Sequence, residues 1–324
     1  MNPDTGHEQD RTGCEEQRTM YFIGVTTGSS SINRLFPLWA EILDLRSVRL
    51  VGVDLALHAP AEQYRQIVTK IRDDPCVAGA AITAHKIDLF AATAGMFDEL
   101  DEYAEICYDV SCISKRGGRL IGHANEPITA GKALHDMLGT SYWPESGGHV
   151  LCLGAGGSGT AIAAHLHGQY STTHGPQRLF MVSRSQPALD RLHRVLDRLP
   201  TSNMRVDYML NEDAASNDRL LAELPSGSLV VNATGMGKDR PGSPISHNAI
   251  FPERGIVWEL NYRGQLDFLR QALSQQQERK LRVFDGWRFF VTCWSEHIAT
   301  IFDRTIPRQR FEQLVRSADA IRGA

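Results

Sequence analysis

The 324-residue chain has little of what marks several classes of protein. Its formal net charge is −4 and its lysines and arginines are scattered, which argues against a nucleic-acid partner. No apolar run is long enough to span a bilayer, which argues against a membrane partner. The 6 cysteines include no C-x-x-C pair, which argues against a metal site. The first residues lack the apolar core of a secretion signal, so we expect a cytoplasmic protein.

Strand and helix patterns alternate over most of the chain. Residues 1–18 are polar and predict a disordered tail. Strands and helices alternate through 19–140, and 141–286 show the βα alternation of a doubly wound parallel sheet. Residues 287–324 are helical, and we expect them to pack back on the first domain. The prediction is an α/β protein in which 19–140 plus 287–324 form an N-terminal α/β domain and 141–286 form a C-terminal Rossmann-type domain.

The stretch from His149 to Ala163, HVLCLGAGGSGTAIA, predicts a dinucleotide site. A short apolar strand ends in glycines at G-x-G-x-x-G spacing, and a helix of small residues follows. The glycines permit a tight turn, the approach of a pyrophosphate and close helix packing, while the helix N-terminus attracts phosphate. The alternative is a plain glycine-rich turn in an α/β sheet. The predicted cofactor residues of this loop are Gly154, Ala155, Gly156, Gly157, Ser158 and Gly159.

The end of the next predicted strand favours NADP over NAD as the cofactor. NAD sites usually carry a carboxylate there, which accepts hydrogen bonds from the ribose hydroxyls, and this strand end has none. Arg184 can pair with a 2′-phosphate, and Ser183 and Ser185 can hydrogen-bond it. The alternative is a solvated arginine at a strand end.

Lys86 and Glu126 form a candidate pair for handling a proton. Lys86 follows a buried strand of small residues, and Glu126 follows a predicted hairpin around Gly117 and Gly118. A lysine beside a carboxylate suits alcohol oxidation, because desolvation and the partner's charge tune its proton affinity. The alternative is a surface lysine and a glutamate at a helix start. The neighbouring His85 could orient a ligand or face solvent, and we expect it to face solvent.

Six ordered segments between Tyr21 and Phe302 resemble those of the shikimate dehydrogenase family. Ala80–Lys86 is similar to the V-T-x-P-x-K segment with the family's catalytic lysine. Gly122–Glu126 is similar to the G-x-N-T-D segment with its catalytic aspartate. The glycine-rich loop follows in the family's order, and Ser183–Ser185 resembles N-R-T, which binds the NADP phosphate.

The last two segments complete the resemblance. Val230–Gly237 is similar to I-N-A-T-x-x-G-M near the nicotinamide, which implies cofactor contacts for Asn232, Ala233, Thr234 and Gly237. Glu259–Tyr262 resembles D-x-x-Y, whose tyrosine borders the substrate. The implied substrate residues are Ser30, Thr83, Ser111, Tyr262 and Cys293.

The chain departs from the family mainly where the family binds its substrate. Ile32 stands in the place of a serine, Ser111 and Ala124 in the places of asparagines, and Cys293 in that of a glutamine. Each change removes a hydrogen-bond partner, so we expect an altered substrate preference. The catalytic aspartate has become Glu126, which keeps the charge.

The resemblance implies an NADP-dependent alcohol dehydrogenase with a place in aromatic amino acid biosynthesis. It implies hydride transfer between NADP(H) and a cyclic polyol or keto acid similar to shikimate or quinate, with Lys86 exchanging the hydroxyl proton and Glu126 holding both groups. A dinucleotide-binding sensor of the same fold without catalysis stays open, as does a homodimer. An enzyme acting on a folate-like substrate is a third reading, against which the order of the Lys86 and Glu126 segments argues.

Overall fold

The structure is a computed structural model that describes residues 17–169, 175–238 and 240–322. The predicted disordered tail, 1–18, lies outside the described residues except for its last two. Arg18 already begins strand β1 (Arg18–Gly24), because its N–H donates to Ser47 O at 2.9 Å. The strand therefore starts at the last residue of the predicted tail.

The chain divides into two units, between Asn125 and Glu126 and again between Thr292 and Cys293. The second unit is Glu126–Thr292, and the first holds the chain on both sides of it. These divisions differ from the predicted ones after residues 140 and 286. Helix α5 (Glu126–Leu138) belongs to the second unit because it packs on α7 (Gly157–Gln169): a Cβ added at Gly131 of α5 would lie 2.2 Å from Cε1 of His165.

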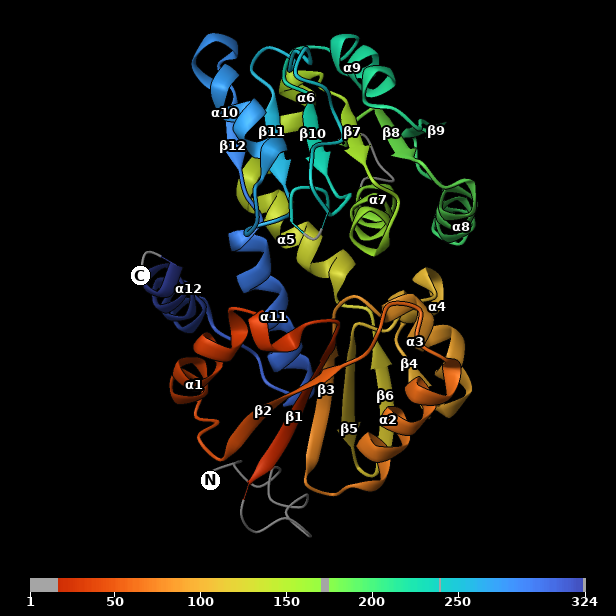
Figure 1. Cartoon of the computed structure of the whole chain (residues 1–324), viewed down its shortest axis with the longest axis vertical. Coiled ribbons are helices and arrows are strands. Elements are labelled where there is room, and N and C mark those ends of the chain that lie inside the picture. The colour runs from red at the N-terminus through yellow and green to blue at the C-terminus, as the bar shows by residue number, and fades with distance from the viewer. Residues whose placement is uncertain (1–16, 170–174, 239, 323–324) are drawn as a thin grey trace, which may run out of the picture. The chain divides into compact units, whose positions relative to one another are not determined.

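The first unit is built on a mixed six-stranded sheet with the order β2-β1-β3-β5-β6-β4 (Figure 1). Strands β1, β2 and β3 run parallel, whereas β5 is antiparallel to both of its neighbours and forms the predicted hairpin with β6. Besides β1, the strands are β2 (Val48–Asp54), β3 (Val77–Ile82), β4 (Glu99–Leu100), β5 (Cys112–Arg116) and β6 (Arg119–His123).

The alternating side chains of β1 explain how helices cover both faces of this sheet. Tyr21 and Ile23 join a core with Tyr64 of α2. Phe22 points to the other face and meets Trp294 of α11 edge to face, with ring centroids 4.8 Å apart. The helices of this unit are α1 (Ile32–Ile42), α2 (Ala61–Asp73), α3 (Lys86–Thr93), α4 (Glu102–Cys107), α12 (Arg308–Arg322) and the part of α11 (Trp287–Ile301) that follows Thr292.

The C-terminal helices pack back on the first unit, as predicted. Helix α12 lies against α1, where Trp39 Nε1 donates to Ser317 Oγ at 3.1 Å. The short helices α3 and α4 were not predicted, and Lys86 is the first residue of α3.

The second unit holds a parallel sheet with the order β12-β11-β10-β7-β8-β9. The chain enters at the central strand β7, moves outward through β8 and β9, and returns to β10 on the other side of β7. This reversal is the doubly wound arrangement that was predicted. The strands are β7 (Val150–Leu153), β8 (Arg178–Ser183), β9 (Arg205–Leu210), β10 (Leu229–Asn232), β11 (Ile256–Glu259) and β12 (Arg282–Phe284).

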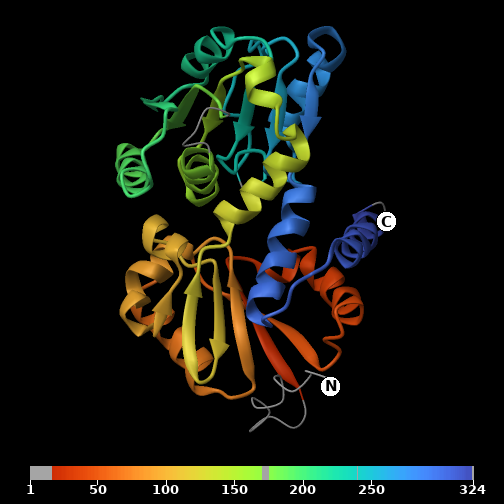
Figure 2. The same ribbon diagram turned by 180° about the vertical axis from the view of Figure 1, so that it is seen from behind.

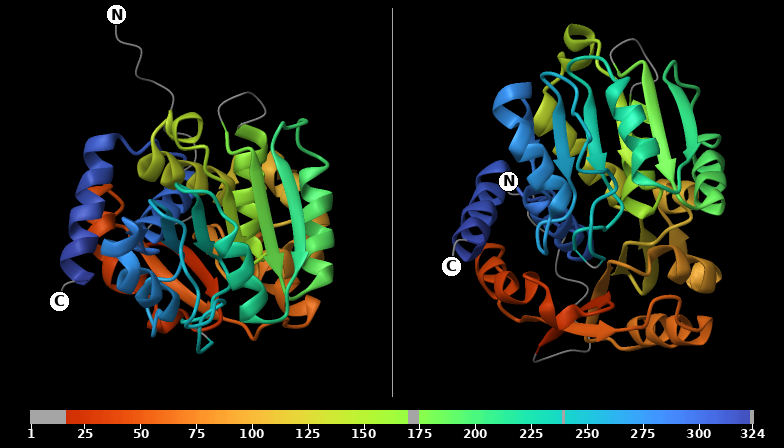
Figure 3. Two further views of the ribbon diagram at one scale, coloured as in Figure 1. Left: turned by 90° about the horizontal axis from the view of Figure 1, so that it is seen from above. Right: turned by 45° about the horizontal axis from the view of Figure 1, so that its top comes forward.

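Helices cover both faces of the second sheet. Helices α5 and α6 cross the face turned to the viewer in Figure 2. Helices α9 and α10 lie in front of the strands in the right panel of Figure 3. Both faces of the central strands are thus covered, which is why β7 and β10 are buried along their whole length. The remaining helices of this unit are α6 (Tyr142–Ser146), α8 (Gln186–Leu196), α9 (Ala214–Ala222) and α10 (Asp267–Arg279).

Candidate active site

The loop between β7 and α7 has the geometry of a phosphate cradle. Gly154 adopts φ 116°, and a Cβ there would lie 2.6 Å from Ala233 O. A Cβ at Gly159 would lie 1.9 Å from Gly154 O. At Gly156, by contrast, no described atom lies within 4 Å of the position of a Cβ, so the backbone is open on that side. The loop thus fits the approach of a pyrophosphate to the start of α7.

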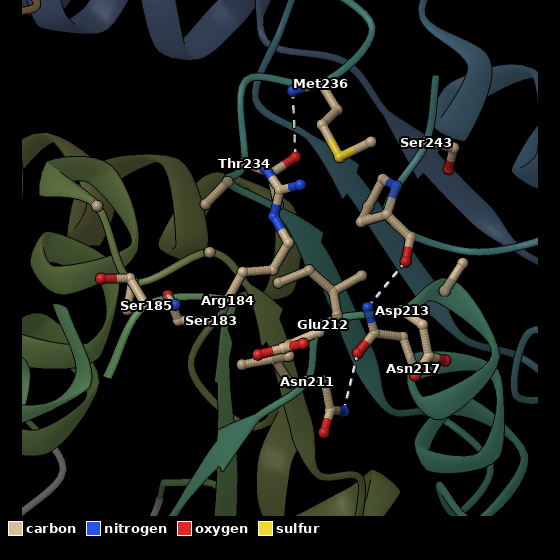
Figure 4. A pocket seen from close by; sticks show the side chains of 18 residues that line it. Ser183, Arg184, Ser185, Asn211, Glu212, Asp213, Asn217, Thr234, Met236 and Ser243 are labelled. Carbon is tan, nitrogen blue, oxygen red and sulfur yellow. Dashed lines mark hydrogen bonds between the residues drawn. The ribbon is translucent and has the colours of Figure 1, made fainter. Parts of the chain in front are cut away.

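A cavity of about 280 Å³ opens at the carboxyl ends of the parallel strands (Figure 4). Most of the cofactor residues predicted from the sequence line this cavity, and they follow the ends of β7, β8 and β10. These residues are Gly154, Ala155, Gly156, Ser183, Arg184, Ser185, Ala233 and Thr234. The predicted residues outside the lining are Gly157, Ser158, Gly159, Asn232 and Gly237.

The turn after β8 presents Arg184 to the cavity. Ser183 Oγ accepts from Ser185 N at 3.1 Å, and Ser185 Oγ accepts from Ala188 N at 3.4 Å and caps α8. Arg184 is exposed, and Figure 4 shows its side chain extended along the cavity. The two serines therefore shape the turn, and the arginine brings a positive charge to the cavity.

The loop after β9 contributes cavity residues that the sequence reading missed. Asn211 Nδ2 donates to Asn217 Oδ1 at 2.9 Å, and Asn217 Nδ2 donates to Pro244 O at 2.8 Å. Glu212 and Asp213 add two carboxylates, and hydrogen bonds from the Ser216 N–H and hydroxyl lower the pKa of Asp213. A usable signal existed for Asn211, Glu212 and Asp213, since they directly follow a strand of the doubly wound sheet, where such sheets bind their ligands.

Asn232 and Gly237 do not line the cavity, but their hydrogen bonds stabilise the loop that forms one of its walls. Asn232 is fully buried, and its Oδ1 accepts from Thr234 N at 3.1 Å and from Thr234 Oγ1 at 2.7 Å. Gly237 O accepts from Leu266 N at 3.1 Å. Both residues therefore act on the shape of the loop 233–237.

Lys86 begins α3 at the end of β3 and is half-buried. Its carbonyl accepts from Val110 N at 3.2 Å, which ties the helix start to the neighbouring chain. The expectation that His85 faces solvent is wrong. His85 is fully buried, and its Nδ1 lies 3.0 Å from the Tyr64 hydroxyl of α2, because the ring fills the space between α2 and α3.

Glu126 is 4% exposed and is the first residue of α5. Its carbonyl accepts from Thr129 Oγ1 at 3.0 Å. It belongs to the second unit, whereas Lys86 belongs to the first, so it lies outside the domain in which it was predicted. The pairing of the two side chains stays a prediction.

The predicted substrate residues differ in what their side chains offer. Ile32 is fully buried in the first unit. Ser111 is also fully buried, and its hydroxyl donates to His123 O at 3.3 Å while accepting from Asn125 N at 2.9 Å. Thr83 is exposed, with its hydroxyl donating to Ile23 O at 3.3 Å.

The other substrate candidates are partly accessible. Ser30 and Cys293 are half-buried. Tyr262 is half-buried against Trp287 and Phe290, at ring distances of 5.4 and 4.6 Å. Ala124, in contrast, is fully buried.

Two predicted absences concern only the part of the chain that the structure describes. Within 17–169, 175–238 and 240–322, no three histidine, cysteine, aspartate or glutamate side chains gather as metal ligands would. Over the same ranges, no helix combines the length and the apolar character that crossing a membrane requires.

Comparison with known proteins places these features in a family context. No protein-family model matches the chain. The chain is 26% identical over 238 residues to the shikimate dehydrogenase (NADP(+)) of Lactococcus lactis subsp. cremoris strain MG1363, covering 72% of this chain and 78% of the relative.

Two solved structures share the fold. Quinate dehydrogenase from Corynebacterium glutamicum in complex with NAD has a TM-score of 0.69 at 18% identity, covering 94% of this chain and 100% of that one. Shikimate 5-dehydrogenase from Thermus thermophilus in complex with NADP(H) and shikimate has a TM-score of 0.66 at 20% identity, covering 93% and 100%.

These comparisons confirm the predicted resemblance to the shikimate dehydrogenase family and the predicted fold class. They also bear out the predictions of an NADP-dependent alcohol dehydrogenase and of NADP as the cofactor. The substrate, the site residues, the homodimer and the cytoplasmic location stay predictions.

Proposed function

We propose that this protein transfers a hydride between NADP(H) and a cyclic hydroxy acid or polyol similar to shikimate or quinate. The observation that carries the proposal is that Gly154–Gly156 of the glycine-rich loop line the same cavity as Arg184. The similarity to NADP(+)-dependent shikimate dehydrogenase supports it.

The second unit supplies the cofactor contacts. The loop Gly154–Gly159 holds the pyrophosphate with the free N–H groups at the start of α7. Arg184 pairs with the 2′-phosphate, and the loop 233–237 faces the nicotinamide half. NADP supplies the hydride chemistry when bound, while the protein supplies position and field.

The first unit supplies the proton. Lys86 Nζ accepts the proton of the substrate hydroxyl during oxidation and donates it during reduction. Glu126 keeps the ammonium and the hydroxyl in place. The hydrogen bonds that tie the backbone of His85 and Lys86 to α3 and to Val110 restrict where this side chain reaches.

We propose that the preferred substrate differs from shikimate. Ile32 carries no polar atom, and the Ser111 hydroxyl already has a donor and an acceptor. Ser30, Thr83, Tyr262 and Cys293 remain as the substrate contacts, so fewer strong hydrogen-bond partners face the ligand.

Replacement of the lysine tests the proposal. We expect Lys86→Ala to lower turnover about 10³-fold with NADP and a panel of shikimate, quinate, dehydroshikimate and amino-substituted analogues, while the Kd for NADPH stays within about twofold. An equal loss of binding and turnover would assign Lys86 a structural role. Tight NADPH binding without turnover on any panel member would favour the sensor, which the loss of polar groups at Ile32 and Ser111 makes the second candidate.

A further inference from the structure

A buried carboxylate lies behind the wall of the cofactor cavity. Glu259 is the last residue of β11 and is fully buried. Its Oε2 accepts from Asn232 Nδ2 at 2.7 Å, and its Oε1 accepts from Asn261 N at 2.8 Å and from Asn261 Nδ2 at 2.7 Å. Among the described residues these donors are all amides, and none of them is a lysine or an arginine.

The two asparagines carry this carboxylate's hydrogen bonds to the loop 233–237. Asn232 Oδ1 accepts from the N–H and the hydroxyl of Thr234, as described above. Asn261 Nδ2 donates to Met236 O at 3.0 Å, and Met236 N donates to Thr234 Oγ1 at 3.1 Å (Figure 4). Thr234 and Met236 both line the cavity. The shape of this wall thus depends on the side chain of Glu259, which does not line the cavity.

The strand order says which part of a dinucleotide this wall faces. Arg184 follows β8 on one side of the central strand β7, and the loop 233–237 follows β10 on the other. A doubly wound sheet binds its dinucleotide across the strand ends on both sides of this reversal, with the adenosine ribose at the end of the second strand. The loop 233–237 therefore faces the nicotinamide half.

We infer that Glu259 is a positioning residue for the nicotinamide half of NADP, which it orients through Asn232, Asn261 and the loop 233–237. The inference rests on the proposed function, because it presupposes that the cavity binds NADP. Glu259 itself touches no cofactor atom.

The cost of burying this group supports a role beyond packing. A carboxylate without a cationic partner loses its hydration in the interior, and burial raises the pKa of Glu259 to about 7 even though three N–H groups donate to it. Apolar side chains of similar volume would pack there at lower cost. What they would not do is hold two asparagine amides in the orientation that fixes Thr234 and Met236.

Glu259→Gln tests the inference by keeping the size of the side chain while turning one acceptor into a donor. That donor faces an asparagine N–H, so one link to the loop breaks. We expect the Kd for NADPH to rise about tenfold, as expected for one lost hydrogen bond to a charged group. The Kd for 2′,5′-ADP, which lacks the nicotinamide half, should stay within about twofold. Calorimetric titration of the full chain with both ligands measures the two constants.

Two further variants control for general destabilisation. Asp207→Asn removes a carboxylate that pairs with Arg178 and Arg205 at the outer strand β9, and it should change neither constant. Asn261→Ser removes the 3.0 Å hydrogen bond to Met236 O and leaves the longer one from Asn232 Nδ2 at 3.5 Å. It keeps the backbone N–H at Glu259, and it should raise the Kd for NADPH alone. It replaces Glu259→Gln if thermal unfolding shows that the glutamine variant does not fold.

Each outcome of these titrations bears on one of the two proposals. Unchanged NADPH affinity in Glu259→Gln or in Asn261→Ser would overturn the positioning role. Equal weakening of NADPH and 2′,5′-ADP would also overturn it, because it would show a merely structural effect. Wild-type protein that binds neither ligand would instead overturn the proposed function.

Discussion

The two units of the molecule carry their candidate functional residues in different ways. In the second unit, the cradle depends on close backbone approaches at Gly154 and Gly159, and hydrogen bonds fix the loop 233–237. In the first unit, the buried Ile32 begins α1 and stands where the family has a serine, and the Ser111 hydroxyl donates to a backbone carbonyl. Cofactor binding that rests on backbone geometry resists change, whereas substrate recognition by side chains changes without disturbing the fold.

The largest effect is expected from a substitution that disrupts the glycine-rich loop of the second unit. Gly159→Ala places a Cβ 1.9 Å from Gly154 O, so the loop must move. We expect more than about 100-fold weaker NADPH binding and a loss of about 3 kcal/mol in the free energy of unfolding, measured by titration and by urea denaturation. Gly95→Ala is the matched control, because no described atom lies within 4 Å of the added Cβ. Equal behaviour of the two variants would contradict the cradle.

A second prediction concerns pH, since burial shifts the pKa of the fully buried Glu259 and that of the half-buried His165 in opposite directions. Burial raises the pKa of Glu259 from 4.5 to about 7, so the folded state holds a proton that the unfolded state has lost, and stability falls as pH rises through this window. Burial lowers the pKa of His165 from 6.5 to about 4, so stability falls as pH drops between these values.

Variants separate the two contributions, each worth up to about 3 kcal/mol. Relative to wild type, Glu259→Gln should gain stability as pH rises from 4.5 to 7, and His165→Gln should gain it as pH falls from 6.5 to 4. Free energies of unfolding from urea titrations across this range measure both slopes. Parallel pH profiles for all three proteins would show that neither group titrates as stated.

A third prediction tests whether Arg184 makes the protein prefer NADP to NAD. Arg184→Ala should weaken NADPH binding about tenfold, because it removes the positive charge expected at the 2′-phosphate, and should leave NADH binding within about twofold. Arg198→Ala, at an exposed position beyond α8, is the control and should change neither constant. Equal weakening of NADPH and NADH binding would show that Arg184 does not bind the 2′-phosphate.

The smallest effect is expected at the buried pair beside Lys86. Tyr64→Phe removes the hydroxyl that lies 3.0 Å from His85 Nδ1. Leaving a buried ring nitrogen without this partner should cost about 1–2 kcal/mol in the free energy of unfolding, measured by urea denaturation. Turnover should fall about threefold with KM unchanged, because α3 begins at this point. Tyr103→Phe, at a half-buried tyrosine of the first unit, is the control. A turnover change without a stability change would argue against the packing role of the pair.

Much of the fold was predictable because it rests on local periodicity. The apolar runs and glycines around 149–163 and the alternation of strands and helices indicated a doubly wound sheet, and the structure has it. Helix α3 was missed because Lys86–Thr93 buries only Leu89 and Thr93 and shows no clear apolar stripe.

The missed features of the site depend on contacts between distant residues. The burial of His85 follows from Tyr64, 21 positions away, and no spacing in the sequence announces it. Likewise, α5 follows the hairpin directly in the chain, but its packing on α7 assigns Glu126 to the second unit. Asn211, Glu212 and Asp213 could have been predicted, since they directly follow a strand of the doubly wound sheet.

A single-turnover experiment tests directly whether the protein transfers a hydride from NADPH to a cyclic keto acid with the help of Lys86. Wild-type protein loaded with one equivalent of NADPH is mixed with dehydroshikimate and related cyclic keto acids, and the loss of the reduced nicotinamide absorbance is followed. We expect at least one of these acids to oxidise the bound NADPH in the wild type. We expect no oxidation in Lys86→Ala, which still binds NADPH. Tight NADPH binding by the wild type without oxidation by any of them would contradict the proposed hydride transfer.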